Sequence, residues 1–136
     1  MVEVLAMQEQ LSAQLRVHPF RYPLLASNPM TQNDKVIIAL TTCPSEHEAS
    51  KLAGTLIAER LVACVNRIPI RSTYLWNNVV QSTAEVQLVM KTTEARFDEL
   101  KTRIKQLHTY ELPELVAIPV CAGAETYLDW VRDNVK

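Results

Sequence analysis

Two long β-prone segments on either side of Asn77-Asn78 constrain the fold more than any other feature of this sequence. Residues 62–76 and 79–91 are rich in Val, Ile, Thr and Tyr, which are residue types that favour strands. Asparagine tolerates a positive φ angle, so this pair suits the tight turn of a β-hairpin. The sequence therefore predicts a hairpin whose arms each extend about 45 Å at ~3.3 Å per residue. Pro69 predicts a break or bulge in the first arm.

The segments around this hairpin alternate between strand and helix patterns. We predict a strand at residues 36–40, a helix at 45–61, a helix that starts near residue 92, a strand at 115–120 and a last helix after Gly123. Ser45 and Glu48 form a capping-box pattern at the start of the first helix. The order β-α-β-β-α-β-α indicates an α+β, ferredoxin-like βαββαβ fold, in which two helices cover one face of an antiparallel sheet, followed by an extra C-terminal helix.

The length of the hairpin also predicts association with other copies of the chain. Two helices of roughly four turns cover only about 23 Å of sheet at ~1.5 Å per residue, so no helix is left to cover the distal end of the hairpin. This end carries large apolar side chains, namely Tyr74, Leu75, Trp76, Val79 and Val80. Because an exposed hydrophobic ribbon with free edges promotes aggregation, we expect an obligate homo-oligomer whose copies close a symmetric ring.

Composition narrows the class of protein. A chain of 136 residues with a formal net charge of −1 fits one domain with its own core. Its charge offers no basic surface for nucleic acid or for a membrane, and no apolar run reaches the roughly 18 residues that span a bilayer. Two glycines are too few for a Gly-rich phosphate loop. Three widely spaced cysteines favour a reducing compartment, and we expect a cytoplasmic protein.

The first 33 residues differ from the remainder of the sequence. They contain three of the seven prolines, and their opening lacks the basic start and the apolar stretch of a secretory signal. We interpret residues 1–33 as a variable extension outside the fold, whether ordered or disordered, and residues 34–136 as the ferredoxin-like domain.

The densest group of chemically capable side chains is His108-Thr109-Tyr110-Glu111-Leu112-Pro113-Glu114. It places a histidine, a phenol and two carboxylates in the loop expected between a helix and a strand, where ligands often bind. A structural interpretation is also open. A histidine in the last turn of a helix interacts favourably with the helix dipole, and Pro113 can mark the start of a strand.

Six segments of the chain resemble motifs of the CutA divalent-cation tolerance family. They are Thr42-Cys43-Pro44, Leu61-Val62-Ala63-Cys64-Val65-Asn66, Ser72-Thr73-Tyr74-Leu75-Trp76, Glu85-Val86 with Met90-Lys91-Thr92, the 108–114 segment, and Tyr127-Leu128 with Trp130. They stand in the family's order, and the resemblance covers about residues 34–134. The chain departs from the family pattern at Thr109, which replaces a proline, at Asn77-Asn78, which replaces a Trp-x-Gly turn, and at Thr41, where some members have a cysteine.

The resemblance implies a ferredoxin-like subunit in a homotrimer similar in design to the PII signalling proteins, with a role in tolerance to copper and other divalent cations. We expect copper or another divalent metal to bind at a cleft between subunits through His108, Glu111 and Cys64. The residues expected to line the same cleft are Lys91, Tyr110, Glu114 and Trp76. So few ligands predict a modest affinity and an open coordination shell.

These residues also have structural interpretations. Cys64 fits a buried free thiol and Trp76 an interface residue, while Lys91 fits an ion pair with Glu85, which we favour over a site for an anion. Two further functions compete with metal binding. One is a PII-like module that binds a small ligand and acts through protein partners, and the other is an enzyme with Cys64 as nucleophile and His108 as base. The sequence shows no third orienting group, so we expect no enzymatic activity.

Overall fold

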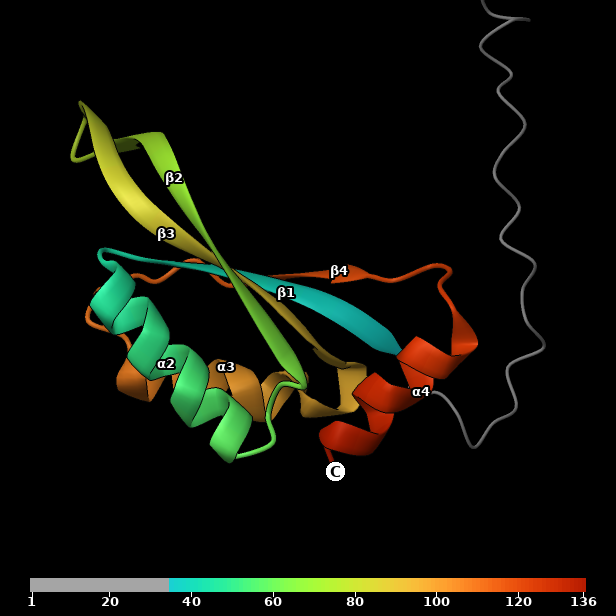
Figure 1. Ribbon diagram of the computed structural model, residues 1–136. Helices are drawn as coiled ribbons and strands as arrows, with labels where there is room; N and C mark the ends of the chain where they lie inside the picture. Colours follow the sequence, from blue (N-terminus) through green and yellow to red (C-terminus); the bar gives the residue numbers. More distant parts are fainter. Residues whose placement is uncertain (1–34) are drawn as a thin grey trace, which may run out of the picture.

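The computed structural model describes residues 35–136, and the predicted extension at residues 1–33 lies outside this range. The described chain is an α+β fold with one four-stranded antiparallel sheet in the order β2-β3-β1-β4 (Figure 1). Its elements are β1 (Val36–Cys43), α2 (Glu46–Ala58), β2 (Cys64–Trp76), β3 (Val79–Thr93), the 3-10 helix η1 (Glu94–Arg96), α3 (Phe97–Leu107), β4 (Val116–Pro119) and α4 (Glu125–Asn134). This order and topology confirm the predicted ferredoxin-like fold with an extra C-terminal helix.

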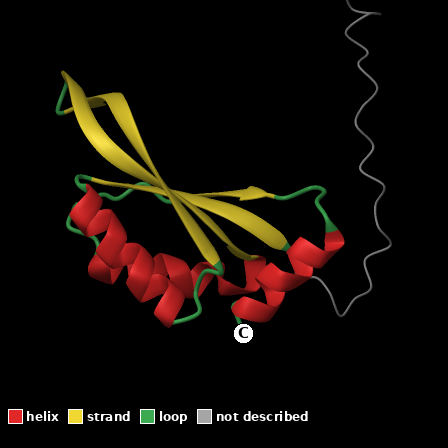
Figure 2. Cartoon of the chain, viewed as in Figure 1, coloured by secondary structure: helices red, strands yellow, loops and turns green. Residues whose placement is uncertain are grey.

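Helices α2 and α3 lie together on one side of the sheet and build the main core with it (Figure 2). Leu56 of α2 and Leu100 and Ile104 of α3 are buried against Leu88 and Met90 of β3. Leu100 and Ile104 are four residues apart, so they share one face of α3. Helices α2 and α3 therefore cover one face of the sheet, as predicted.

Helix α4 forms a second, smaller core at the end of the sheet where β1 begins. Its residues Leu128 and Val131 pack with Val36 of β1, and all three are buried.

None of the helices in residues 35–136 is long and apolar enough to cross a membrane.

A local sequence pattern sets the first residue of α2, whereas strand pairing sets the first residue of α3. Ser45 caps α2 as its pattern predicted, because its Oγ accepts a 3.2 Å hydrogen bond from the backbone N–H of Glu48. Helix α3 starts at Phe97 and not near residue 92. The reason is that Thr92 and Thr93 still pair with β1 and so extend β3.

The hairpin has the predicted turn but not the predicted irregularity. Asn77 and Asn78 both have positive φ angles, 49° and 61°, as a type I′ turn requires. From this turn the pairing runs without interruption to Cys64 opposite Lys91, so the predicted break or bulge at Pro69 is wrong. β2 is an edge strand, where a proline nitrogen that faces the open edge costs no ladder hydrogen bond.

Apolar side chains stay exposed at the end of the hairpin and along β4. Leu75 is 65% exposed and Val80 is 70% exposed, as the length of the hairpin predicted. On β4, Val116 and Ile118 are about half exposed. They pair with even-numbered residues of β1, which places them on the sheet face away from α2 and α3. The described chain therefore leaves these β4 side chains and both sheet edges without a partner.

Candidate functional site

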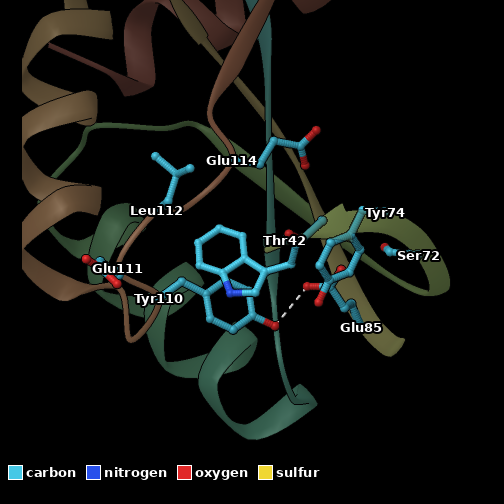
Figure 3. Close-up of a pocket in the computed structure, with 9 residues that line it drawn as sticks. Thr42, Ser72, Tyr74, Glu85, Tyr110, Glu111, Leu112 and Glu114 are labelled. Atoms are coloured by element: carbon cyan, nitrogen blue, oxygen red, sulfur yellow. Dashed lines mark hydrogen bonds between the residues drawn. The ribbon is translucent and has the colours of Figure 1, made fainter. Parts of the chain in front are cut away.

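A cleft of about 470 Å³ lies between the hairpin and the loop that follows α3 (Figure 3). Its walls come from β1, β2, β3 and the 110–114 loop. The lining residues are Thr42, Ser72, Tyr74, Trp76, Glu85, Tyr110, Glu111, Leu112 and Glu114. The cleft thus combines aromatic rings, hydroxyl groups and carboxylates, and no Lys, Arg or His of the described chain is among its lining residues.

Strand alternation brings the hairpin residues to this cleft. Ser72, Tyr74 and Trp76 lie two residues apart on β2, so their side chains share one face of the sheet. Ile70 of β2 pairs with Glu85 of β3, which puts the Glu85 side chain on that same face. Because the turn fixes the register of the two strands, it also fixes the composition of this wall.

The His108 side chain connects the loop to the end of β1 through hydrogen bonds. Its Nε2–H donates a 2.7 Å hydrogen bond to the carbonyl oxygen of Thr42, and its Nδ1 accepts a 3.0 Å bond from the backbone N–H of Tyr110. Since Nδ1 is an acceptor here, these bonds assign the ring proton to Nε2. Further along the loop, the Thr41 hydroxyl donates to the carbonyl oxygen of Glu114 at 2.6 Å. The loop is therefore held against β1 at two points.

Glu85 supplies a buried carboxylate to the cleft, with 8% of its surface exposed. Its Oε2 accepts a 2.9 Å hydrogen bond from the Tyr110 hydroxyl, drawn as a dashed line in Figure 3. Within residues 35–136 this carboxylate has no other hydrogen bond and no ion pair. Burial, the bond to Glu85 and the charge of Glu85 raise the pKa of Tyr110, so the phenol stays protonated and acts as a donor.

A buried thiol lies next to the His108 ring. Cys43 is 2% exposed, and its Sγ is 3.9 Å from Nε2 of His108. Burial, followed by the negative charges of Glu48 and Glu85, raises the pKa of this thiol to about 11. The Cys43 side chain is therefore protonated near neutral pH in the metal-free chain.

Comparisons with known proteins assign the family. The family model described as CutA1 divalent ion tolerance protein matches residues 37–134. This chain belongs to the CutA1 family. Among its relatives, the divalent-cation tolerance protein CutA of Thermus thermophilus is 46% identical over 98 residues, which are 71% of this chain and 95% of that protein.

Other relatives are longer than the matched region. The chloroplastic protein CutA 1 of Oryza sativa is 39% identical over 101 residues, which are 74% of this chain but 57% of the rice protein. This chain therefore spans just over half of that protein. The solved structure of the divalent cation tolerance protein from Thermus thermophilus superposes with a TM-score of 0.72 at 44% identity, and the match covers 74% of this chain and 99% of that one.

This CutA1-family chain brings four of the predicted site residues into the cleft, namely Trp76, Tyr110, Glu111 and Glu114. His108 is beside the cleft and not in its wall. Its ring lines a neighbouring hollow, together with Cys43 and the exposed His47 at the start of α2. The predicted histidine and the predicted carboxylates therefore belong to the same loop but face different spaces.

Cys64 lies far from this loop within one chain. It pairs with Lys91, which in turn pairs with Ile38. His108 bonds to Thr42, four residues further along β1, so about 13 Å separates the two levels at ~3.3 Å per residue. The described chain alone does not bring Cys64 together with His108. Within residues 35–136 no group of three or more His, Cys, Asp or Glu side chains is arranged to hold a metal ion.

Lys91 has a different partner from the one expected. Its Nζ donates a hydrogen bond to the side-chain oxygen of Asn66 on the neighbouring strand. Glu85 is six residues away along β3 and bonds to Tyr110 instead. The expected ion pair between Lys91 and Glu85 is therefore wrong. The two residues lie on one face of β3, but about 20 Å separates them at ~3.3 Å per residue, so their side chains do not meet.

Five residues of the cleft wall were not predicted from the sequence, namely Thr42, Ser72, Tyr74, Glu85 and Leu112. The sequence did contain a pattern from which the hairpin residues of the wall could have been predicted. Alternation backward from Trp76 predicts Tyr74 and Ser72 on the same face, and a two-residue turn at Asn77-Asn78 sets Glu85 on that face as well. For Leu112 and Thr42 no such signal exists, because they meet the cleft through the path of a loop.

Proposed function

We propose that this chain is a homotrimeric divalent-cation response protein that binds copper or another divalent metal between subunits through His108, Glu111 and Cys64. The names of its relatives, divalent-cation tolerance proteins, support a role with cations. One structural observation carries the intersubunit placement. Cys64 and the loop of His108 and Glu111 are at different levels of the sheet in one chain, so two copies are needed for these side chains to meet.

The unpartnered surfaces of the described chain support the assembly. β2 and β4 are both edge strands, and the hairpin end exposes Leu75, Trp76, Val79 and Val80. Copies that pair their edges in a closed ring would bury this apolar ribbon, whereas an isolated ribbon would aggregate. The family resemblance favours three copies in a PII-like arrangement.

Metal binding at His108 requires one ring nitrogen to leave its present partner. Nδ1 is the simpler choice, because it already carries the lone pair that accepts the Tyr110 N–H. Nε2 would first have to lose its proton and its bond to Thr42. Release of the Tyr110 N–H would move the loop that forms one wall of the cleft. We therefore expect metal binding to change the shape of the cleft.

Isothermal titration of copper and zinc into the metal-free, full-length chain tests this proposal. His108→Ala removes the ligand, and His47→Ala is the matched control because His47 is exposed at the start of α2. We expect saturable binding to the wild type and to His47→Ala, and an affinity lower by at least about tenfold in His108→Ala. No binding to the wild type, or equal binding to both variants, would refute a site at His108.

A second function is favoured by the cleft itself. A PII-like module that binds a small ligand and acts through protein partners needs a pocket, and about 470 Å³ lies within the range of small-molecule sites. A ligand-induced rise in melting temperature in the presence of EDTA would support this function.

We propose a non-enzymatic role in a reducing compartment, the cytoplasm. Cys43, Cys64 and Cys121 are unpaired in the described chain, which fits such a compartment. The enzyme hypothesis required Cys64 beside His108 as nucleophile and base. Two copies that bring Cys64 to His108 would also join this pair, so it is the missing third, orienting group in the sequence that argues against an enzyme.

A further inference from the structure

We propose that the cleft between the hairpin and the 110–114 loop binds a small organic cation, with its ammonium group held by Glu85 and by the rings of Tyr74 and Tyr110. Such a ligand differs from the divalent metal proposed above, and none of that metal's three ligands is among the residues that hold the ammonium group. Three features of the cleft point to it: its unpaired charge, its aromatic walls and its size.

The charge of the cleft is negative, and no counter-charge stands among its lining residues in the described chain. Glu85 is 8% exposed, and the Tyr110 hydroxyl occupies only its Oε2, so Oε1 is left without a protein donor in residues 35–136. Glu111 and Glu114 add two further carboxylates to the lining, to which no described Lys, Arg or His contributes. Burial of a charge that has no counter-charge is costly. A bound cation would supply the missing charge.

The aromatic walls favour an ammonium group over a bare metal ion. Tyr74 and Trp76 share one face of β2, and Tyr110 faces them from the loop. In Figure 3 the Glu85 carboxylate lies between the rings of Tyr110 and Tyr74. Ring faces attract ammonium groups, whereas divalent metals need oxygen, nitrogen or sulfur ligands in a defined shell. Such a shell is absent from the described chain.

Two hydrogen bonds hold the tyrosine rings in place before any ligand arrives. The Thr83 hydroxyl donates to the hydroxyl oxygen of Tyr74 at 3.1 Å, and Tyr110 is fixed by its bond to Glu85. A wall that is already ordered loses little conformational entropy when a ligand binds. The cleft of about 470 Å³ accommodates a small molecule, and is much larger than a single metal ion requires.

Isothermal titration of choline into the full-length chain, in its native assembly and in the presence of EDTA, tests this site. The control compound is 3,3-dimethylbutan-1-ol, in which a carbon atom replaces the choline nitrogen, so it has the same shape without the charge. We expect saturable binding of choline and at least about tenfold weaker binding of the neutral analogue, because only choline compensates Glu85 and interacts with the rings as a cation. No saturable binding of choline, or equal binding of both compounds, would overturn the proposal.

Two variants locate the site. Glu85→Gln keeps an acceptor for Tyr110 but removes the charge, and we expect it to weaken choline binding by at least about tenfold. Glu94→Gln removes one negative charge from an exposed residue in η1 at the far end of β3, and it should bind choline like the wild type. Equal loss in both variants would indicate a non-specific charge effect and would overturn the site.

A further variant keeps the test decisive if Glu85→Gln fails to fold. Tyr74→Leu retains an apolar side chain at an exposed position but removes a ring face, and it should also weaken choline binding. Wild-type affinity in this variant would exclude the aromatic wall. Because EDTA is present and His108 is unchanged, these results are independent of the copper and zinc titration.

Discussion

The Tyr110 hydroxyl and the Glu85 carboxylate are joined by a 2.9 Å hydrogen bond, although 25 residues separate them in the chain. Tyr110 belongs to the loop after α3 and Glu85 belongs to β3, so this bond ties the loop to the hairpin. It also gives the buried carboxylate its hydrogen-bond donor from the described chain. The stability of the loop and the shape of the cleft therefore depend on the same pair of residues.

Removal of the phenol should destabilise the protein. Tyr110→Phe leaves a buried carboxylate without its donor, and we expect the free energy of unfolding to fall by about 1–3 kcal/mol. Urea unfolding at a fixed protein concentration measures this change. Tyr127→Phe is the matched control, because Tyr127 is 45% exposed and its ring stacking on Trp130 survives the substitution. Equal effects of the two substitutions would contradict the role given to the Glu85 bond.

The buried thiol of Cys43 should make stability decrease at high pH. Its pKa is raised from 9.0 to about 11 in the folded state, so the unfolded chain releases this proton first as the pH rises. The folded chain then binds more protons, and the free energy of unfolding falls between pH 9 and pH 11 by an amount on the order of 2 kcal/mol. Below pH 9 this contribution is fully present.

Urea unfolding across that pH interval, compared between wild type and Cys43→Ala, isolates this contribution. The variant should show a shallower pH dependence than the wild type, whereas Cys121→Ala, at an exposed position, should keep the wild-type slope. If Cys43→Ala retains the full slope, other groups cause the pH dependence and our explanation fails.

The stability of the hairpin should respond differently to two substitutions at Asn78. Asn78 has a φ of 61°, which glycine adopts freely and alanine does not. We expect Asn78→Ala to lower the free energy of unfolding by about 1 kcal/mol and Asn78→Gly to leave it unchanged or raise it slightly. Thermal unfolding followed by circular dichroism distinguishes the two. An alanine variant as stable as the glycine variant would argue against a type I′ turn.

The hairpin end should matter for assembly more than an exposed apolar residue elsewhere. Trp76 is 45% exposed on the hairpin and Ile57 is 42% exposed on α2. We expect Trp76→Ala to dissociate or weaken the oligomer, because large aromatic residues dominate interface energies, while Ile57→Ala leaves it intact. Sedimentation velocity reports the assembly state directly, and an unchanged oligomer in Trp76→Ala would exclude the hairpin end as an interface anchor.

The fold was predictable because local patterns agree with one another. The Ser45 cap and the Asn77-Asn78 turn each act within a few residues, and each is found where we predicted it. The start of α3 was predicted too early, since pairing of Thr92 and Thr93 with β1 overrides the local tendency. Such pairing joins segments that are far apart in the sequence, which a local pattern does not contain.

The cleft was predictable only in part. The hairpin side of its wall follows from strand alternation and the turn, which together place Tyr74 and Glu85 on one face. The loop side depends on how residues 108–114 cross the end of β1. That path is set by the bonds of His108 to Thr42 and of Thr41 to Glu114, and no periodicity in the sequence encodes it.

The most direct test of a metal site between subunits is anomalous scattering from crystals of the copper-loaded chain. The predicted result is a copper peak within bonding distance of Nδ1 of His108, with Glu111 of the same copy and Cys64 of a neighbouring copy as further ligands. A copper peak elsewhere, with the hydrogen bond from the Tyr110 N–H to His108 intact, would contradict the proposal and would make His108 a structural residue of the loop.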